Sequence, residues 1–287
     1  MIIMSLNKLK EAAMRIIFLI SACVSIIAVV VICVFLFVNG VPAMAEIGFF
    51  DFLLGETWRP TSGLYGIMPM ILGSIYVTAG AIIVGVPLGL LTAVFMAYFC
   101  PPKLYKVLKP AVELMAGIPS VVYGFFGLVV MVPLVRTTLG GRGTSMLTAS
   151  LLLGIMILPT IIGVSESAIR AVPRSYYEGS LALGATKERS VFFSVLPAAK
   201  SGVLAAVVLG IGRAIGETMA VIMVAGNQAR MPGGLLEGVR TLTANIVMEM
   251  GYAQDLHREA LIATAVVLFV FILIINLSLS LLRKRSK

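Results

Sequence analysis

Long apolar runs constrain the fold of this chain more than any other feature of its sequence. A helix needs around 20 consecutive apolar residues to cross the hydrocarbon core of a bilayer. Only 12% of the 287 residues are charged, about half the share found in a soluble domain, so the chain cannot cover a water-facing surface. The sequence therefore predicts an all-α integral membrane protein with about six transmembrane helices. The expected spans are residues 16–38, 70–99, 110–135, 144–169, 200–226 and 259–282.

The first and last expected spans differ in composition from the middle four. The first and last are uniformly apolar, whereas the middle four carry Gly, Pro, Ser and Thr, which favour close helix packing in membranes. A cleavable signal peptide is the competing interpretation of the first span, because Ala43-Met44-Ala45 resembles a cleavage site. The apolar run is longer than the roughly 7–15 residues of a signal peptide, so we expect an uncleaved helix.

The distribution of positive charge predicts orientation. The formal net charge is +9, but the basic residues sit beside apolar runs and not among exposed aromatics on a polar domain, as nucleic-acid binding would need. With the N-terminus inside, the inner segments hold fifteen Lys and Arg and the outer segments hold six. Cytoplasmic loops carry the excess of Lys and Arg, so both termini are predicted to be cytoplasmic.

The outer segment between the first two spans, residues 39–69, is rich in aromatic and acidic side chains, including Phe49, Phe50, Phe52 and Trp58. Aromatic rings are favoured at the membrane interface, so we expect this segment to lie there. A docking surface for an external partner, shared with residues 227–258, is the alternative. His257 is the only histidine, which argues against a histidine-based metal site or catalytic triad.

The inner loop, residues 172–197, has the pattern of two short helices around a glycine turn. Pro173 can begin the first helix, Gly184 supplies the turn and Pro197 begins the entry to the fifth span. The loop resembles the EAA loop of permease subunits of binding-protein-dependent ABC importers, whose pattern is EAA, three residues, G, nine residues, I, one residue, LP. Glu178, Gly184, Leu196 and Pro197 fall on that spacing, while Gly179, Ser180 and Ser194 replace Ala, Ala and Ile.

In that family the loop lies in a groove on the ATP-binding subunit and transmits its movement. The resemblance therefore implies a type I ABC importer permease fold. No G-x-x-x-x-G-K-[ST] phosphate-binding loop occurs in the chain, so ATP is expected to be hydrolysed by separate subunits. We expect a channel-forming subunit and not an enzyme.

Two charges lie inside the fifth expected span. Arg213 and Glu217 are four positions apart, hence on one face of a continuous helix. A charge at mid-membrane costs at least about 2.5–3.5 kcal/mol on insertion scales, so both should face the protein interior or water. A planar guanidinium suits an oxyanion, which makes Arg213 a candidate for the path of an anionic substrate, with Glu217 positioning it. A pair that only neutralises itself is the structural alternative.

Further segments narrow the resemblance to phosphate-specific ABC importer permeases. These segments are Glu113–Gly127, Gly210–Val221 and Ala225–Asn227, and the outer stretches Trp58–Pro60, Tyr65–Pro69 and Gly73–Ser74 resemble the PstC member of the permease pair more than its PstA sibling. In that family Arg213 and Glu217 match intramembrane charges implicated in phosphate passage. Glu113 and Glu166 match other charged positions, for which an interfacial or packing role is the alternative.

The resemblance implies partners and no cofactor or metal. The partners are a second homologous permease (PstA-like), a dimer of ATP-binding subunits (PstB-like), an external phosphate-binding protein (PstS-like) and the lipid bilayer of a bacterial or archaeal cytoplasmic membrane. Residues 1–69 would form the N-terminal helix and outer loop, and residues 70–287 the permease domain. A permease for sulfate or molybdate is the nearest alternative. An ion-coupled secondary transporter is a second alternative, against which the loop at Glu178–Pro197 argues.

Overall fold

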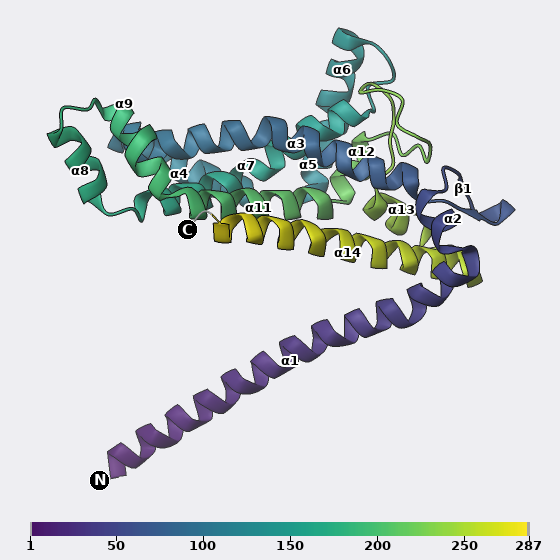
Figure 1. Ribbon diagram of the computed structural model, residues 1–287, viewed down its shortest axis with the longest axis horizontal. Helices are drawn as coiled ribbons and strands as arrows, with labels where there is room; N and C mark the ends of the chain where they lie inside the picture. Colours follow the sequence, from purple (N-terminus) through teal and green to yellow (C-terminus); the bar gives the residue numbers. More distant parts are fainter. Residues whose placement is uncertain (1, 286–287) are drawn as a thin grey trace.

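Helices make up almost all of the protein, whose computed structural model describes residues 2–285 (Figure 1). Within those residues the strands form one antiparallel hairpin, in which Trp58 pairs with Tyr65 and Arg59 with Leu64. The all-α prediction is confirmed. The elements in chain order are α1 (Ile2–Ile47), α2 (Phe49–Leu54), β1 (Trp58–Arg59), the 3-10 turn η1 (Pro60–Ser62), β2 (Leu64–Tyr65), α3 (Met68–Val94), the π-helical turn η2 (Phe95–Phe99), α4 (Pro102–Gly117), α5 (Ser120–Phe126), the π-helical turn η3 (Gly127–Met131), α6 (Val132–Leu139), α7 (Met146–Arg170), α8 (Arg174–Ala182), α9 (Lys187–Ser190), the π-helical turn η4 (Val191–Val195), α10 (Leu196–Ala198), α11 (Lys200–Gly216), α12 (Met219–Val224), α13 (Leu242–Glu249) and α14 (Asp255–Arg285).

The number of membrane spans agrees with the expectation of about six. In the part of the chain that the structure describes, five helical stretches are long and apolar enough to cross a bilayer, and a sixth is added if a pair of helices bent by 72° counts as one span. The prediction that both termini are cytoplasmic refers to the chain ends, and the end residues 1 and 286–287 lie outside the described residues. The five stretches are Ala13–Ile47, Met68–Phe99, Ser120–Leu139, Met146–Arg170 and Asp255–Ser278, and the bent pair is Lys187–Ala198 with Lys200–Gly216.

The third span begins later than residues 110–135 suggested. Residues 110–117 belong to α4, and the apolar stretch starts at Ser120 after a break at Ile118 and Pro119. Proline has no backbone N–H and forces the preceding residue out of the helical region, and Ile118 accordingly has an extended ψ of 126°. An apolar run in the sequence therefore spans two helices that the backbone chemistry of proline separates.

The fifth span, expected over 200–226, is also interrupted. Helix α11 ends at Gly216, and α12 begins at Met219. Glu217 between them is extended, with φ −69° and ψ 129°, and the Thr218 hydroxyl donates to the Gly216 carbonyl at 3.2 Å. Such local side-chain hydrogen bonds compete with the helical ladder, which gives a physical reason for the break at this position.

The centre of the bundle is formed by α3, α7 and α11, which run side by side with α14 in Figure 1. Small residues permit the close approach of α3 to α7, since a Cβ on Gly85 would lie 2.7 Å from the Ile157 side chain. Transmembrane helices pack through such small residues because apolar burial gives no driving force within lipid. The buried cluster at this centre includes Ile157 and Ile161 of α7 and Ala214 of α11.

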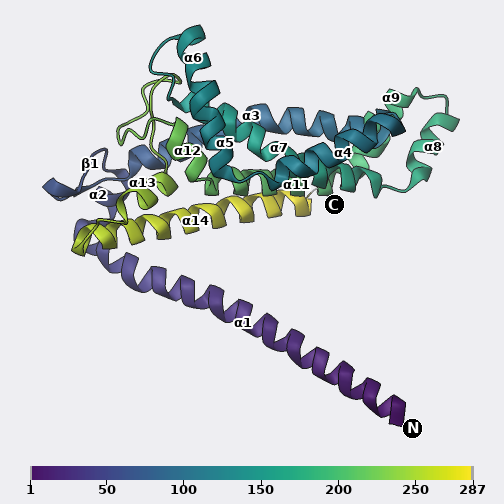
Figure 2. The ribbon, with the colours of Figure 1, turned by 180° about the vertical axis from the view of Figure 1, so that it is seen from behind.

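The N-terminal helix α1 and the outer segment differ in their packing. Figures 1 and 2 both show the first half of α1 standing apart from the other helices. Apolar side chains along α1, such as Ile20 and Ile26, are exposed. The placement of residues 39–69 at the membrane interface stays a prediction, but Phe52, 0% exposed, and Trp58, 6% exposed, are covered by other parts of the protein. Both are core residues, because α2 and the hairpin pack against α14. Phe49 and Phe50 are exposed.

Candidate functional site

The two interrupted spans pack against each other beyond their breaks. A Cβ on Gly124 of α5 would lie 2.9 Å from the Ala220 Cα of α12 and 2.7 Å from the Met223 sulfur. Glycine at this position therefore permits the two short helices to touch. The break at Ile118–Pro119 and the break at Glu217–Thr218 immediately precede these helices.

Arg213 lies in the last turn of α11, before the second break. Its Nη1 donates a hydrogen bond of 3.2 Å to the Thr160 hydroxyl of α7, and the side chain is half-buried. Thr160 follows Pro159, which lies inside α7. The cluster that buries Ala214, the neighbour of Arg213, also contains Tyr123 of α5, so helices α5, α7 and α11 all contribute to the surroundings of the guanidinium.

The expectation that Arg213 and Glu217 share one helix face is wrong. Glu217 lies after the end of α11 in extended backbone, and its carboxylate accepts a hydrogen bond of 3.2 Å from the Ala220 amide of α12. Within residues 2–285 no ion pair joins Arg213 to Glu217 or to another carboxylate. The self-neutralising pair is therefore not formed, and the Arg213 guanidinium keeps N–H donors beyond the one that Thr160 accepts.

Side chains bind carbonyl groups at both breaks. The Tyr123 hydroxyl donates to the Met115 carbonyl at 3.0 Å, across the break between α4 and α5. The Thr243 hydroxyl of α13 donates to the Glu217 carbonyl at 3.2 Å. Irregular backbone at membrane depth needs such partners or a water-lined cavity. Discontinuous helices of this kind form the substrate sites of many membrane transporters.

The inner loop folds as the sequence predicts. Helix α8 begins directly after Pro173, Gly184 adopts a left-handed φ of 86°, and α9 follows with Thr186 as its N-cap. The Thr186 hydroxyl accepts from the Arg189 amide at 3.3 Å, and Pro197 lies in the first turn of α10. Two short helices around a glycine turn are therefore confirmed.

The loop projects from one end of the bundle, opposite the hairpin (Figure 1). Its outer side is exposed, with Leu183 at 91% exposure and Phe193 at 78%. Its inner side is fixed by a buried cluster with the ends of α3 and α7. Of the residues expected to couple to an ATPase, Glu178, Gly179, Gly184 and Pro197 are exposed, and Ser180 and Leu196 are half-buried.

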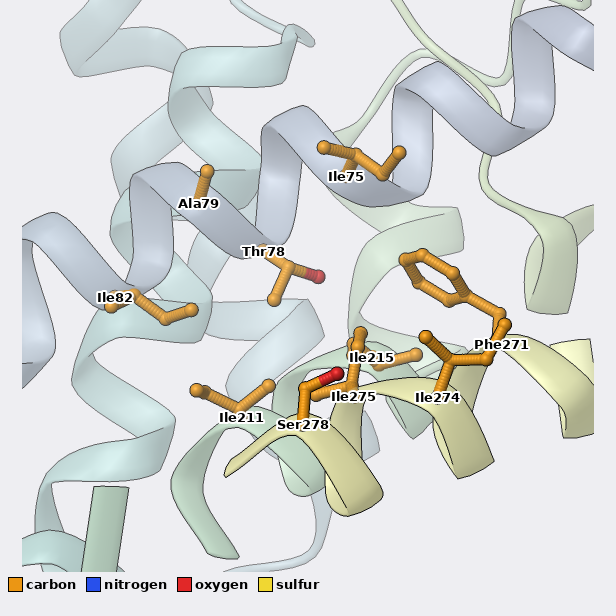
Figure 3. Close-up of a pocket in the computed structure, with 10 residues that line it drawn as sticks. All are labelled: Ile75, Thr78, Ala79, Ile82, Ile211, Ile215, Phe271, Ile274, Ile275 and Ser278. Atoms are coloured by element: carbon orange, nitrogen blue, oxygen red, sulfur yellow. The ribbon is translucent and has the colours of Figure 1, made fainter. Parts of the chain in front are cut away.

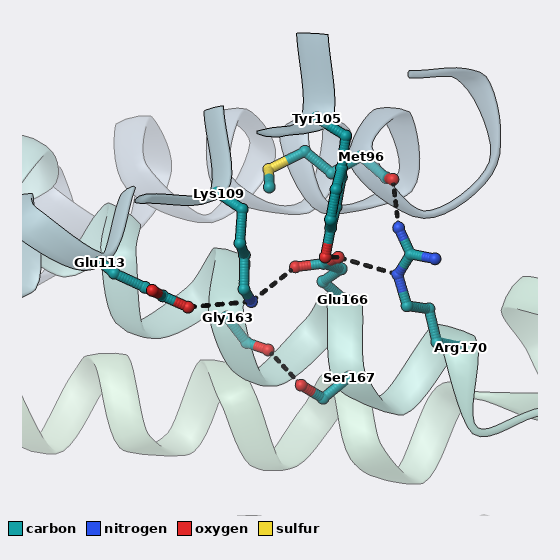
Figure 4. Close-up of polar contacts among 8 residues, drawn as sticks. All are labelled: Met96, Tyr105, Lys109, Glu113, Gly163, Glu166, Ser167 and Arg170. Carbon is teal, nitrogen blue, oxygen red and sulfur yellow. Dashed lines mark hydrogen bonds and ion pairs between the residues drawn. The ribbon is translucent and has the colours of Figure 1, made fainter. Parts of the chain in front are cut away.

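Glu166 is the centre of a polar cluster near this loop, drawn in Figure 4. Its carboxylate accepts from Tyr105 Oη at 2.7 Å, Lys109 Nζ at 2.9 Å and Arg170 Nε at 2.8 Å. Arg170 also donates to the Met96 carbonyl at 2.8 Å. The hydrogen bond to Glu166 is the main reason that the pKa of Lys109 is raised above its ordinary value, so Lys109 is charged at neutral pH.

Glu113 and Glu166, the other two carboxylates that match charged positions of the family, have different surroundings. Glu166 is 1% exposed and joins three donors, so it has no surface to offer an anion. Glu113 is exposed and lies 3.8 Å from Lys109 on its own helix. Neither contacts Arg213 in the part of the chain that the structure describes. Glu166 therefore fits the packing role that was the alternative to a transport role. Glu113 forms an exposed ion pair with Lys109.

A second buried carboxylate, Glu249, organises the outer end. Its Oε2 accepts from Trp58 Nε1 at 2.8 Å and also lies 2.9 Å from His257 Nε2, and its Oε1 accepts from Arg240 Nη1 at 2.6 Å. No sequence pattern indicated this cluster, since Trp58 and Glu249 are 191 positions apart.

One apolar groove elsewhere in the bundle lacks the features of an anion site. The groove in Figure 3, of about 360 Å³, lies between α3, α11 and α14 and contains no charged side chain. Its polar groups are the hydroxyls of Thr78 and Ser278. Among residues 2–285, no three His, Cys, Asp or Glu side chains are grouped so that they could hold a metal ion.

Comparison with known families and proteins points to membrane transport. Residues 85–287 match the family described as "Binding-protein-dependent transport system inner membrane component". The chain is 39% identical to the probable ABC transporter permease protein YqgH of Bacillus subtilis (strain 168), over 94% of this chain and 91% of that protein. It is 35% identical to the phosphate transport system permease protein PstC of Mesorhizobium japonicum, over 84% of this chain and 80% of that protein.

Solved structures share the fold at low sequence identity. A chain of the MetNI methionine ABC transporter, in an inward-facing conformation, superposes with a TM-score of 0.64 at 20% identity and covers 80% of this chain and 100% of that chain. A chain of an amino acid ABC transporter crystallised with histidines superposes with a TM-score of 0.57 at 19% identity, over 76% and 93% of the two chains. These likenesses establish the fold of a type I ABC importer permease.

Proposed function

This chain belongs to the family of inner membrane components of binding-protein-dependent transport systems, and from that membership we propose that it is a PstC-type permease subunit of an ATP-driven importer of inorganic phosphate, forming half of the translocation pathway. Similarity to several PstC permeases over most of the chain supports the substrate. The observation that carries the anion path is Arg213, a half-buried guanidinium next to a broken span with no carboxylate partner within the described residues.

The anion passes Arg213 in the proposed mechanism. A guanidinium presents N–H groups in a fixed fork that matches two oxygens of phosphate, and its hydroxyl partner Thr160 holds the side chain toward α7. Glu217 accepts the Ala220 amide and so holds the start of α12. Its negative charge in the same path would weaken anion binding. This favours passage over tight binding, because a site that holds phosphate too strongly would not release it.

ATP hydrolysis belongs to other subunits in this proposal. As a member of its family the chain works with a second permease, an ATPase and a binding protein. We assign these roles to a PstA-like permease, a PstB-like dimer and a PstS-like external protein. The exposed loop around Glu178, Gly179, Ser180, Gly184, Leu196 and Pro197 is the proposed contact with the ATP-binding subunit, since its outer side is free and its inner side is anchored.

The domain division and location complete the proposal. Residues 1–69 form an N-terminal helix and outer segment, and residues 70–287 form the permease domain, which contains the matched family region. The complex lies in the cytoplasmic membrane of a bacterium or archaeon. The phosphate-binding protein delivers its ligand to the outer end, where the hairpin and α13 lie (Figure 1).

The test is ATP-dependent phosphate uptake in proteoliposomes that hold the complete complex. We expect Arg213→Gln to lower the uptake rate by about tenfold or more, because it removes the cation that offsets the anion in a site with little water. Arg213→Lys should recover part of the rate, since it restores charge without the fork. Arg258→Gln, at an exposed arginine, is the matched control and should transport normally.

Two outcomes would contradict the proposal in different ways. Normal uptake by Arg213→Gln would remove Arg213 from the path and leave the substrate standing. Uptake of sulfate or molybdate in place of phosphate by the unaltered complex would overturn the substrate and leave the permease assignment standing.

A further inference from the structure

The Glu166 cluster joins three elements at the inner end of the bundle. Glu166 and Arg170 belong to α7, Tyr105 and Lys109 to α4, and the Met96 carbonyl to η2 at the end of α3. The Arg170 guanidinium also lies over the Tyr105 ring, 4.7 Å from its centroid. Figure 4 shows these side chains converging on one carboxylate.

The Glu166 cluster lies next to the inner loop of residues 172–197, which is called the coupling loop from here on. Arg170 is the last residue of α7, and the loop helix α8 begins at Arg174. The loop also touches η2 directly, since the rings of Tyr177 and Tyr98 lie 5.1 Å apart and Lys187 Nζ lies 5.0 Å from the centroid of the Phe99 ring. Movement of the loop therefore reaches Met96 and Arg170 through packed contacts.

Helix α4 connects the Glu166 cluster to the region of the proposed anion path at Arg213. It ends at Gly117, immediately before the break at Ile118–Pro119. The Met115 carbonyl at this end accepts the Tyr123 hydroxyl of α5, and α5 packs on α12 beyond the second break. A displacement of α4 would therefore act on both interrupted spans.

The cluster is the charged contact that fixes α4 on α7. Its carboxylate is buried and fully occupied by donors, so it cannot bind the transported anion. A buried ion cluster is a poor source of net stability, because desolvation offsets most of the attraction, but it fixes one relative position of the elements it joins. The cluster is therefore better explained as fixing the position of α4 on α7 than as adding stability.

We propose that Glu166, together with Tyr105, Lys109 and Arg170, is the joint that makes α4 and the break at Ile118–Pro119 follow the ATPase-driven movement of the coupling loop. Glu166 is thus a positioning residue for transport, acting through α4, and it does not touch the substrate. The inference rests on the proposed function, since coupling has meaning only in an ATP-driven importer.

The first experiment measures ATP hydrolysis and phosphate uptake in the same proteoliposomes. Glu166→Gln keeps the shape but removes the charge that holds three donors. We expect ATP hydrolysis to persist while phosphate transported per ATP falls by about tenfold, with the KM for phosphate unchanged. Glu259→Gln, at an exposed carboxylate on α14 outside the cluster, is the control and should stay within about twofold of the unaltered complex.

A milder variant covers the case in which Glu166→Gln does not assemble. Tyr105→Phe removes one donor and keeps the ring under Arg170, and should lower the transport ratio by about threefold. An unchanged ratio in these variants, or a parallel fall of hydrolysis and uptake, would overturn the joint, because a merely structural role predicts one of those results.

A distance measurement tests the joint without reference to substrate. Spin labels at Lys106→Cys on α4 and Ser175→Cys on α8, both exposed positions, are placed in a complex whose Cys23, Cys33 and Cys100 are serine. We expect the distance between the labels to be the same with and without ATP, and to change with ATP when Glu166→Gln is added. A distance that already changes in the presence of Glu166 would refute the joint. If the unaltered complex hydrolyses ATP but imports no phosphate, the proposed function fails and this measurement still decides the inference.

Discussion

Glu166 and Glu249 are the two carboxylates that this fold buries within its described residues, and each is held by three groups. A buried charge persists only when it is paired and hydrogen-bonded. The two lie at opposite ends of the bundle, one beside the coupling loop and one beside the outer hairpin. Arg213 between them differs, because its single recorded partner is the Thr160 hydroxyl. The paired charges hold elements together, whereas Arg213 has no carboxylate partner among residues 2–285, which is why we propose it for the anion path.

Removal of the Glu249 carboxylate should destabilise the outer end. Glu249→Ala leaves Arg240 buried without its counter-ion and Trp58 Nε1 without an acceptor, so we expect the free energy of unfolding to fall by about 3 kcal/mol. The melting temperature of the purified complex measures this loss. Glu237→Ala, which breaks the exposed pair with Arg230, is the control and should cost about 0–1 kcal/mol. Equal effects of the two variants would contradict a burial-based explanation.

The interrupted helices are the elements that form the surroundings of the proposed anion path. Spans three and five are each divided at a point where local chemistry opposes the helix, Pro119 in one and the Thr218 hydroxyl in the other. The segments beyond the breaks pack together through Gly124. The coupling loop is likewise built from short helices. Gly184 at its turn has a positive φ of 86°, which residues with a Cβ rarely adopt.

A side chain at the loop turn should disturb coupling. Gly184→Ala places a Cβ in the left-handed region at a cost of about 1–2 kcal/mol, so α8 and α9 should change their relative orientation. We expect less ATP-binding subunit to co-purify with the permease. Gly163→Ala is the control, because Gly163 lies in α7 outside the loop with space around a Cβ and alanine favours the helix. If both variants retain the subunit fully, the turn geometry is not needed for assembly.

The whole molecule places the hairpin and the coupling loop at opposite ends (Figure 2), which sets a test of its orientation. Positive-inside bias puts the loop in the cytoplasm. In a background without native cysteines, Glu178→Cys should react with a membrane-impermeant maleimide only after the membrane is opened, whereas Thr61→Cys should react from outside. Both positions are exposed. Labelling in the reverse pattern would invert the assigned topology.

Some features followed from the sequence because their causes are local. Apolar runs of membrane length require helices whatever their neighbours, and the prolines and glycine of residues 172–197 correctly predicted the two loop helices and their turn. The interruption of the run at 200–226 was missed, and the span expected at 110–135 starts later, at Ser120. The sequence showed Pro119, but an apolar pattern alone does not reveal where a span begins.

Long-range contacts were decided by tertiary structure alone. Periodicity placed Arg213 and Glu217 on one face because it assumed an unbroken helix, and the extended backbone of Glu217 separates them. Likewise, no pattern joins Tyr105 to Glu166 or Trp58 to Glu249, because these pairs come from helices far apart in the chain. The sequence by itself determined that the chain lies in a membrane and where its loop turns. Only the packed bundle decided which charges meet, since burial and distance arise when helices come together.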